Sequence, residues 1–495
     1  MIKKIFNLLP KRISDRIEQS PIGNRLATGA AWSLVGSLTA KFLQLVSFVV
    51  VARIFGKEGF GEFSIVQSTV AMFGTLAGFG LGLASNKFIS EFKLTNTERA
   101  GRIISLTSTV AIITSTLAAV LLFATSSVIA QMMLNAPQLQ SAIALSSILL
   151  FFIALTGSQT GILTGFEAFK EIARINFING ISSFPILIVG VYFGGLTGAI
   201  IGLIIITLIN WIQNYIAIRR QCIEFNIPLK SKGFWEEKKT LFQFSIPSVL
   251  GSILIGAATW FTSTLLVNQN NGYAEMGIYS AILRVKQIPE LIIGMFLTPL
   301  LPVLSEQYGL RNKQTFNKTL KYGFALSILL GIPFAGVLLA FPNLTYLPFG
   351  SGFKGSAITV QILMLHLILV ATFTPMGQTL ASMNKMWFGF FYNVAYGLFF
   401  VVMSYMYIPE YGATGLAIAQ CVSYFITSMI CIVYIYITEK EFIIDTGIIR
   451  SLFTILIFTA IIFVLSFMLP AIWLSLAIIV CAVFITIKHL PKIKN

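Results

Sequence analysis

The chain has 495 residues, of which 56% are hydrophobic and only 11% charged, and its mean hydropathy is +0.86. Because soluble proteins carry about 25% charged residues, this composition predicts a polytopic membrane protein and excludes a soluble enzyme, a secreted disulfide scaffold and a nucleic-acid-binding protein. The formal net charge of +16 fits the surplus of lysine and arginine on cytoplasmic loops of membrane proteins. We expect no disulfide, since all four cysteines lie in or beside apolar segments: Cys222, Cys421, Cys431 and Cys481.

The N-terminal segment 1–26 combines six basic side chains with apolar residues at helical spacing, among them Ile2, Ile5, Leu9 and Ile13. This pattern predicts a short amphipathic helix on the inner face of the membrane. It does not predict a signal peptide, because no short apolar stretch ends in a small-residue cleavage site.

Fourteen apolar stretches follow, each close to the roughly 20 residues that a transmembrane helix requires. We therefore predict an all-α protein with six spans in 27–218, a cytoplasmic loop at 219–240, six spans in 241–437 and two more in 451–488. The stretches are 27–53, 61–86, 103–130, 141–163, 177–193, 198–218, 241–267, 276–303, 320–342, 357–381, 388–407, 413–437, 451–469 and 471–488. Two of them are short, so twelve spans is the alternative count.

The basic residues predict the orientation of these spans. With the N-terminus inside, 28 of the 34 lysines and arginines fall on cytoplasmic segments, and only Arg53, Lys57 and Lys354 on outer loops. This bias places both termini in the cytoplasm. No ATP-binding Gly-x-x-x-x-Gly-Lys sequence occurs, and no segment outside the membrane is long enough for a catalytic domain. Transport without a cofactor is therefore the first hypothesis, and intramembrane catalysis the second.

The two groups of six spans repeat each other weakly but in order. Short matches recur at a nearly constant spacing along the chain: 34–38 with 249–253, 56–64 with 272–280, Asn176 and Gly180 with Asn393 and Gly397, and 195–199 with 412–416. Because both groups start inside, the repeats are parallel. This predicts two six-helix lobes, with the substrate path between them.

The sequences ARIFGKEGFGEFS (52–64) and GIYSAILRVKQIPELIIGMFLTPLLPVLSEQY (277–308) resemble the polysaccharide transporters of the multidrug/oligosaccharidyl-lipid/polysaccharide exporter superfamily. The resemblance covers roughly residues 25–440 in topology and spaced glycines. It implies an alternating-access flippase for undecaprenyl-diphosphate-linked repeat units of O-antigen, as in lipopolysaccharide biosynthesis, or of capsule. It further implies the bacterial inner membrane as location, and a polymerase and glycosyltransferases of the same pathway as partners.

Lys41 lies near the middle of the first span, on one helical face with Ser33, Ser37 and Gln44. A charge at mid-membrane costs about 2.5–3.5 kcal/mol. Either end of the span is about twelve residues away, or ~18 Å, which a lysine stem cannot bridge. We therefore predict that Lys41 faces protein or water.

The eighth span carries Arg284, Lys286, Gln287 and Glu290 around Pro289. Together with Lys41, these residues give three cations and one anion within the membrane, a balance that suits an anionic ligand such as a diphosphate. We predict Lys41, Arg284 and Lys286 as substrate-binding residues and expect no metal site. Glu290 is either a coupling group or the structural partner of Lys286, one helical turn away.

Several other polar residues are weaker candidates for a functional role. Gln44, Gln287 and Arg53 are candidate supporting residues of the cationic site. The hydroxyl residues of the seventh span are expected to let helices approach closely rather than to bind sugar. His366, in the tenth span, has no carboxylate near it in the sequence, so we expect a satisfied packing histidine rather than a proton relay.

Three alternative functions remain open. A multidrug exporter for organic cations would require a carboxylate in the first lobe, and no aspartate or glutamate lies inside the first six predicted spans. A flippase for the peptidoglycan precursor would share both the fourteen spans and the cationic character. An intramembrane polymerase or ligase would require acid–base groups near an outer loop, and the predicted outer loops contain no histidine.

Overall fold

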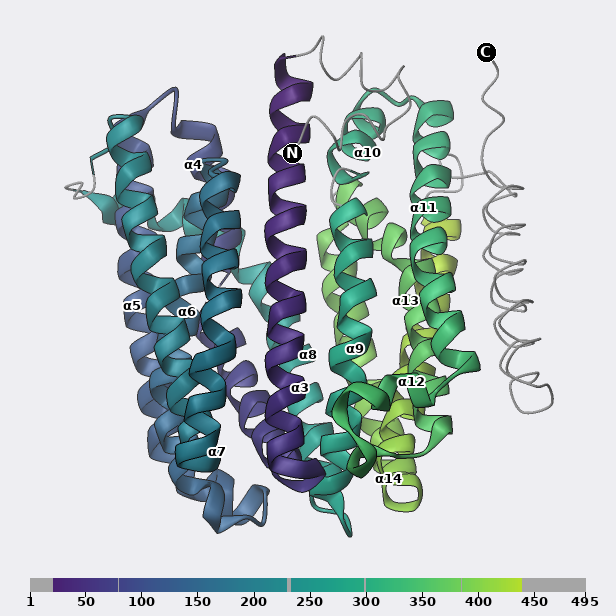
Figure 1. The fold of residues 1–495 in the computed structure, drawn as a ribbon. Helices are drawn as coiled ribbons and strands as arrows, with labels where there is room; N and C mark the ends of the chain where they lie inside the picture. Colours follow the sequence, from purple (N-terminus) through teal and green to yellow (C-terminus); the bar gives the residue numbers. More distant parts are fainter. Residues whose placement is uncertain (1–20, 79, 229–232, 298–299, 384, 439–495) are drawn as a thin grey trace. The chain divides into compact units, whose positions relative to one another are not determined.

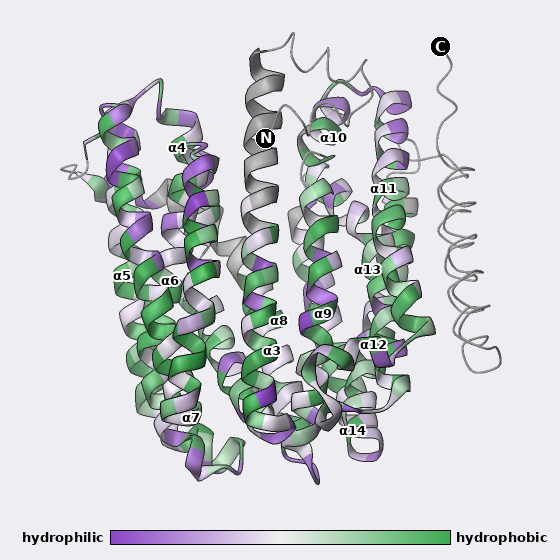
Figure 2. Ribbon diagram, in the orientation of Figure 1, coloured by the Kyte–Doolittle hydropathy of each residue, from purple (hydrophilic) through white to green (hydrophobic). Residues whose placement is uncertain are grey.

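The computed structural model describes residues 21–78, 80–228, 233–297, 300–383 and 385–438. Helices are the only regular structure in these ranges (Figure 1), and eight of them are long and apolar enough to cross a membrane. Figure 2 shows apolar residues along most of their length. The predicted all-α polytopic fold is confirmed. Residues 1–20 of the predicted amphipathic segment, and the two predicted spans within 451–488, lie outside the described ranges.

Three helices are long enough for two predicted spans each, and each turns at one glycine. They are α3 (Pro21–Gly78), α7 (Phe169–Glu224) and α14 (Met386–Thr438). Their turning points, Gly56, Gly195 and Gly412, have φ values of 68°, 53° and 54° with extended ψ. Only glycine adopts this conformation without strain, because it has no Cβ. The first and second, fifth and sixth, and eleventh and twelfth predicted spans are thus hairpins.

The remaining α-helices are α4 (Leu81–Phe92), α5 (Thr97–Val128), α6 (Gln140–Gly165), α8 (Lys238–Val267), α9 (Gly272–Leu297), α10 (Leu300–Gly309), α11 (Lys313–Ala340), α12 (Asn343–Tyr346) and α13 (Ala357–Ser382). Single turns complete the order: η1 (Ile129–Met133), η2 (Pro137–Leu139), η3 (Phe234–Glu237), η4 (Leu347–Phe349) and η5 (Ser351–Phe353). The predicted span 61–86 is interrupted and followed by the short helix α4, and the predicted span 276–303 is described as α9 up to Leu297 and as α10 from Leu300. Before α4 the cause is Gly80, whose φ of 61° ends the helical path.

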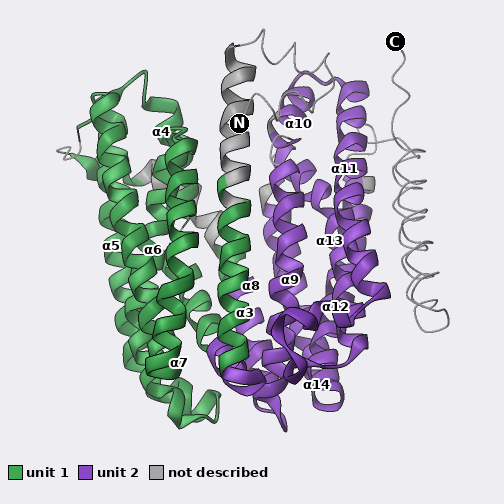
Figure 3. Cartoon of the chain, in the orientation of Figure 1, with its two compact units in different colours: residues 1–54, 66–253 green, residues 55–65, 254–495 purple. Residues whose placement is uncertain are grey.

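The chain forms two compact units (Figure 3). Unit 1 comprises residues 1–54 and 66–253, and unit 2 comprises 55–65 and 254–495. The turn of α3 thus groups with the second half of the chain. The lobe limits drawn from the sequence, 27–218 and 241–437, stay a prediction.

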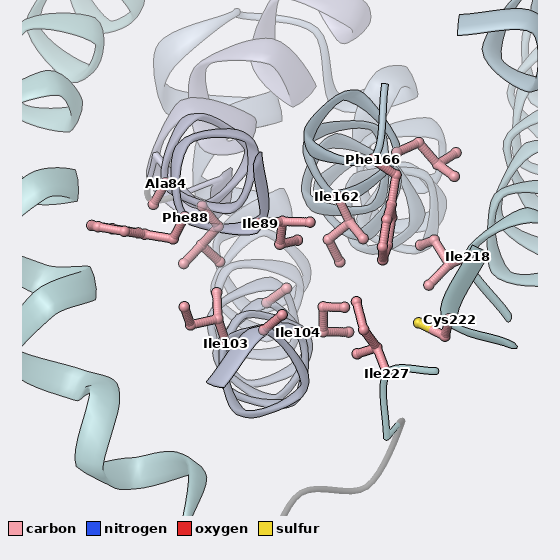
Figure 4. Packing of buried hydrophobic residues seen from close by; sticks show 14 of the residues in the cluster. Ala84, Phe88, Ile89, Ile103, Ile104, Ile162, Phe166, Ile218, Cys222 and Ile227 are labelled. Atoms are coloured by element: carbon pink, nitrogen blue, oxygen red, sulfur yellow. The ribbon is translucent and has the colours of Figure 1, made fainter. Parts of the chain in front are cut away.

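Unit 1 has an apolar core where α4, α5, α6 and α7 meet (Figure 4), with Phe88, Ile104, Phe166 and Cys222 among its members. Ion pairs fasten the chain beside this core. Lys93 Nζ lies 2.8 Å from Glu167 Oε1. Arg99 Nε donates to both carboxylate oxygens of the buried Glu237, at 3.0 and 3.1 Å, which ties η3 to α5.

The sequence repeat reappears in the backbone. Gly195 (φ 53°, ψ −135°) and Gly412 (φ 54°, ψ −128°), which open the matched segments 195–199 and 412–416, have nearly the same conformation. The same two segments contain Gly198 and Gly415, each of which packs against a backbone carbonyl of the other arm of its hairpin. A Cβ on Gly198 would lie 1.9 Å from the carbonyl oxygen of Gly190, and a Cβ on Gly415 would lie 2.2 Å from the carbonyl oxygen of Tyr407, the residue that the repeat matches to Gly190. The fifth–sixth and eleventh–twelfth hairpins are therefore built in the same way.

A second pair of repeat-related glycines meets inside unit 2. A Cβ on Gly61 would lie 1.8 Å from the carbonyl oxygen of Tyr273, and a Cβ on Gly277 would lie 1.9 Å from that of Lys57. The match of 56–64 with 272–280 pairs Gly61 with Gly277 and Lys57 with Tyr273. The two contacts are therefore equivalent, and the two segments cross with local two-fold symmetry. Each glycine lets the other segment's backbone approach.

Candidate functional site

In unit 1, the predicted polar face of α3 lies beside α7. Lys41 is half-buried, and its Nζ donates a hydrogen bond to Gln44 Oε1 at 3.2 Å. One turn further, the hydroxyls of Ser47 and Ser183 are 3.3 Å apart. The helices approach closely here: a Cβ on Gly180 would lie only 3.0 Å from the Cα of Ala40. The structure thus brings Lys41 and Gln44 together, whereas the side chains of Ser33 and Ser37 lie outside those described.

In unit 2, α9 presents an ion pair. The Lys286 side chain is only 3% exposed, and its Nζ lies 2.9 Å from Glu290 Oε1, whose side chain is 32% exposed. Arg284, on the same helix, is half-buried, and Gln287 is exposed. Arg53, on α3, is exposed as well. The structure therefore brings Lys286 and Glu290 into contact.

Polar residues of α13 and α14 lie within electrostatic reach of this ion pair. The Tyr279 hydroxyl donates to Gln420 Oε1 at 2.8 Å. The His366 ring centroid lies 5.1 Å from that of Tyr424, whose centroid is 6.2 Å from that of Tyr396. Glu290 is close enough to these tyrosines for their charges to interact. We call this set the polar cluster of unit 2: Tyr279, Lys286, Glu290, His366, Tyr396, Gln420 and Tyr424.

The sequence reasoning missed Tyr396, Gln420 and Tyr424. The internal repeat could have drawn attention to the last two, because the alignment of 195–199 with 412–416 also pairs Gln420 with Leu203 and Tyr424 with Thr207. Likewise, the alignment of 56–64 with 272–280, continued along the chain, pairs Lys286 with Val70. The helix hairpins repeat, but the charges and ring hydroxyls of unit 2 do not.

The chemistry available to the described residues is that of cations and hydrogen bonds. Among them, no group of three or more histidine, cysteine, aspartate or glutamate residues could hold a metal ion. Cations beside hydrogen-bonding side chains can attract and orient an anion without making or breaking a bond.

A family model described as polysaccharide biosynthesis protein matches residues 26–307, more than half of the chain. The chain belongs to the polysaccharide biosynthesis protein family. The resemblance drawn from its glycine-spaced segments is thereby confirmed.

Three relatives of this polysaccharide biosynthesis protein have names that bear on its role. Stage V sporulation protein B of Bacillus subtilis (strain 168) is 20% identical over 71% of this chain and 71% of its own. Lipid III flippase of Escherichia coli (strain K12) is 22% identical over 57% of this chain and 67% of its own. Capsular polysaccharide biosynthesis protein CapF of Staphylococcus aureus is 26% identical over 43% of this chain and 53% of its own.

Solved transporter structures share the fold of this family member. The lipid II flippase MurJ, in an inward closed conformation, is 14% identical over 92% of this chain and 97% of its own, with a TM-score of 0.67. An inward-facing multidrug resistance MATE family transporter of the MOP superfamily is 13% identical over 81% and 97%, also with a TM-score of 0.67. At these identities the likeness shows the fold alone.

Proposed function

We propose that this protein is a flippase that moves undecaprenyl-diphosphate-linked oligosaccharide from the inner to the outer leaflet of the bacterial inner membrane. Its membership of the polysaccharide biosynthesis protein family is the observation that carries the proposal. The names of two relatives, a lipid III flippase and a capsular polysaccharide biosynthesis protein, agree with it. The cargo would be a repeat unit of O-antigen, capsule or another surface polysaccharide, made and used by glycosyltransferases and a polymerase.

The cations explain how such a cargo could be recognised. A diphosphate carries the negative charge that Lys41, Arg284 and Lys286 attract, and organic cations would be repelled. Arg284 offers a planar fork that can hold two phosphate oxygens, whereas a lysine acts as a point charge. Lys286 is already paired with Glu290, so a diphosphate must compete with that carboxylate. The prenyl tail stays in lipid while the lobes alternate between inward and outward access.

A precursor of peptidoglycan is the second candidate cargo, because it is also a prenyl diphosphate. The lipid II flippase MurJ shares the fold of this chain, and at 14% identity it shares the fold alone. Complementation separates the two: this chain should restore surface polysaccharide in a strain without its own repeat-unit flippase. Rescue of a strain depleted of its peptidoglycan-precursor flippase, without rescue of polysaccharide, would assign the second cargo.

The cation hypothesis predicts a graded series of variants. Lys41→Ala, Arg284→Ala and Lys286→Ala should each reduce surface polysaccharide about tenfold or more, which corresponds to losing about 1.4 kcal/mol or more of substrate interaction. Arg284→Lys should retain part of the function, because the charge persists and the fork is lost. Polysaccharide is measured per amount of inserted protein, with the exposed Lys318→Ala as the matched control. Normal output from all three alanine variants would refute the cation hypothesis.

The predicted orientation can be tested with introduced thiols, because the native Cys222 is a poor probe. It is 1% exposed, and burial raises the pKa of its thiol to about 11, so it reacts slowly from either side. Ser351→Cys and Glu236→Cys replace exposed residues on a predicted outer loop and the predicted cytoplasmic loop. A membrane-impermeant maleimide should label Ser351→Cys in intact cells, and Glu236→Cys only after the inner face is opened. The reverse pattern would invert the topology.

A further inference from the structure

His366 of α13 is buried in a way that packing alone does not explain. Its side chain is 4% exposed, and neither ring nitrogen has a hydrogen-bond partner within the described part of the chain. It is therefore not the satisfied packing histidine expected from the sequence. Buried polar groups are normally hydrogen-bonded, so an unpaired imidazole in a packed interior points to a ligand. The smallest ligand that an imidazole binds is a proton.

The charges that reach His366 come from α9. Lys286 is close enough for its charge to interact with the imidazole. A neighbouring cation opposes a second proton on the ring, and a neighbouring carboxylate favours it. Because Lys286 is paired with Glu290, the charge that His366 experiences depends on whether that pair is intact.

Among the described residues, the other helices packed against α13 place no lysine, arginine, aspartate or glutamate beside His366. From α14, the facing titratable groups are Tyr424, whose ring contacts His366, Tyr396 behind it, and Cys421. From α11, residues 323–340 include no titratable side chain, and from α10 the titratable residues are Glu306 and Tyr308. Glu306 is exposed, and Tyr308 packs on Phe316 at the start of α11.

We propose that His366 is a proton-binding site within unit 2, and that the Lys286–Glu290 pair controls its occupancy. Burial of the ring and the charge of Lys286 beside it both oppose a second proton, so His366 stays neutral while that charge is not compensated. When an anion takes over Lys286, a hydronium ion transfers its proton to a ring nitrogen, giving imidazolium and water. The link to an anionic substrate rests on the proposed function, but the proton site itself does not.

The chain offers a direct measurement, because it has only two histidines. In a His489→Gln background, ¹⁵N-histidine labelling of the full chain in nanodiscs observes His366 alone. Imidazolium and neutral imidazole have distinct ¹⁵N shifts, so the protonated fraction can be read at about pH 6, near the ordinary pKa of histidine.

Four proteins should rank by the charges left beside the ring. The protonated fraction should be lowest in Glu290→Gln, higher in the parent, higher again in the double Lys286→Met, Glu290→Met variant, and highest in Lys286→Met. The protonated fractions of Glu290→Gln and Lys286→Met should differ about tenfold or more, because one nearby charge changes the pKa of a titratable group by about one to three units. Lys318→Met, the same change at an exposed lysine, should leave the fraction unchanged. Equal fractions in all variants, or the opposite rank, would overturn the proposal.

Adding farnesyl diphosphate separates this inference from the proposed function. If a diphosphate binds Lys286, it should raise the protonated fraction of His366 in the parent and not in Lys286→Met. A ranked variant series without any response to the diphosphate retains the proton site and rejects Lys286 as its ligand. A response that persists in Lys286→Met contradicts control by this ion pair.

Discussion

Alanine in place of Gly61 or Gly277 is expected to abolish transport and to lower the apparent melting temperature. The added Cβ would lie 1.8 Å from the carbonyl oxygen of Tyr273 in one case and 1.9 Å from that of Lys57 in the other. The obstacle is backbone, which cannot swing aside as a flexible side chain does, so the two segments must separate. Overpacking of an interior typically costs about 1–3 kcal/mol, and a clash with backbone belongs at or above the upper end of that range.

A matched control is available in the same unit. Gly389 of α14 has no heavy atom within 4 Å of an added Cβ, so Gly389→Ala should be neutral or slightly stabilising. The double Gly61→Ala, Gly277→Ala variant should cost less than the sum of the singles, because one separation relieves both clashes. Thermal unfolding in nanodiscs and surface polysaccharide output are the measurements. Unchanged melting and output in both single variants would contradict the crossing described here.

The architecture could be predicted from the sequence because its signals are local. Apolar length identifies a transmembrane helix, and a glycine is visible wherever a hairpin requires an unusual φ or a close approach. Gly195 and Gly412 illustrate this: they were matched by a short sequence motif, and they adopt the same backbone conformation. The pairing of Lys286 with Glu290 was predictable for the same reason, since side chains one helical turn apart are neighbours on one face.

The surroundings of that pair could not be predicted, because they depend on which helix faces meet. Gln420 and Tyr424 are far from α9 in the sequence, yet Gln420 accepts a hydrogen bond from Tyr279 of α9, and Tyr424 contacts His366, which the charge of Lys286 reaches. His366 was expected to be satisfied, but its ring nitrogens are unpaired among the described residues. Cys222 falls in the predicted cytoplasmic loop 219–240, yet the packing of α4 to α7 buries it. Burial and partner choice are tertiary properties, and periodicity in one segment does not report them.

Replacing both members of the Lys286–Glu290 pair by methionine is expected to stop transport while the protein stays folded. Exchanging a paired lysine and carboxylate for apolar side chains of similar size is often neutral for stability. A pair that only holds α9 in register would therefore be dispensable. Loss of transport with normal insertion and melting would instead mean that the charges act on substrate or on a coupling ion. Full transport by the double variant, insensitive to a protonophore, would exclude a coupling role for Glu290 and weaken the claim that Lys286 binds diphosphate.

Two single variants then separate the roles of the pair. Glu290→Gln removes the carboxylate that competes with a diphosphate for Lys286, so it should bind farnesyl diphosphate more tightly than the parent. If Glu290 couples the cycle to a proton gradient, the same variant should transport poorly, because the site no longer takes up and releases a proton. Glu290→Asp keeps an ionisable group and should retain partial transport. Tighter binding with slower transport in Glu290→Gln, together with partial transport in Glu290→Asp, is the expected signature of a carboxylate that acts in the transport cycle. Wild-type transport by Glu290→Gln would leave Glu290 as a structural partner alone.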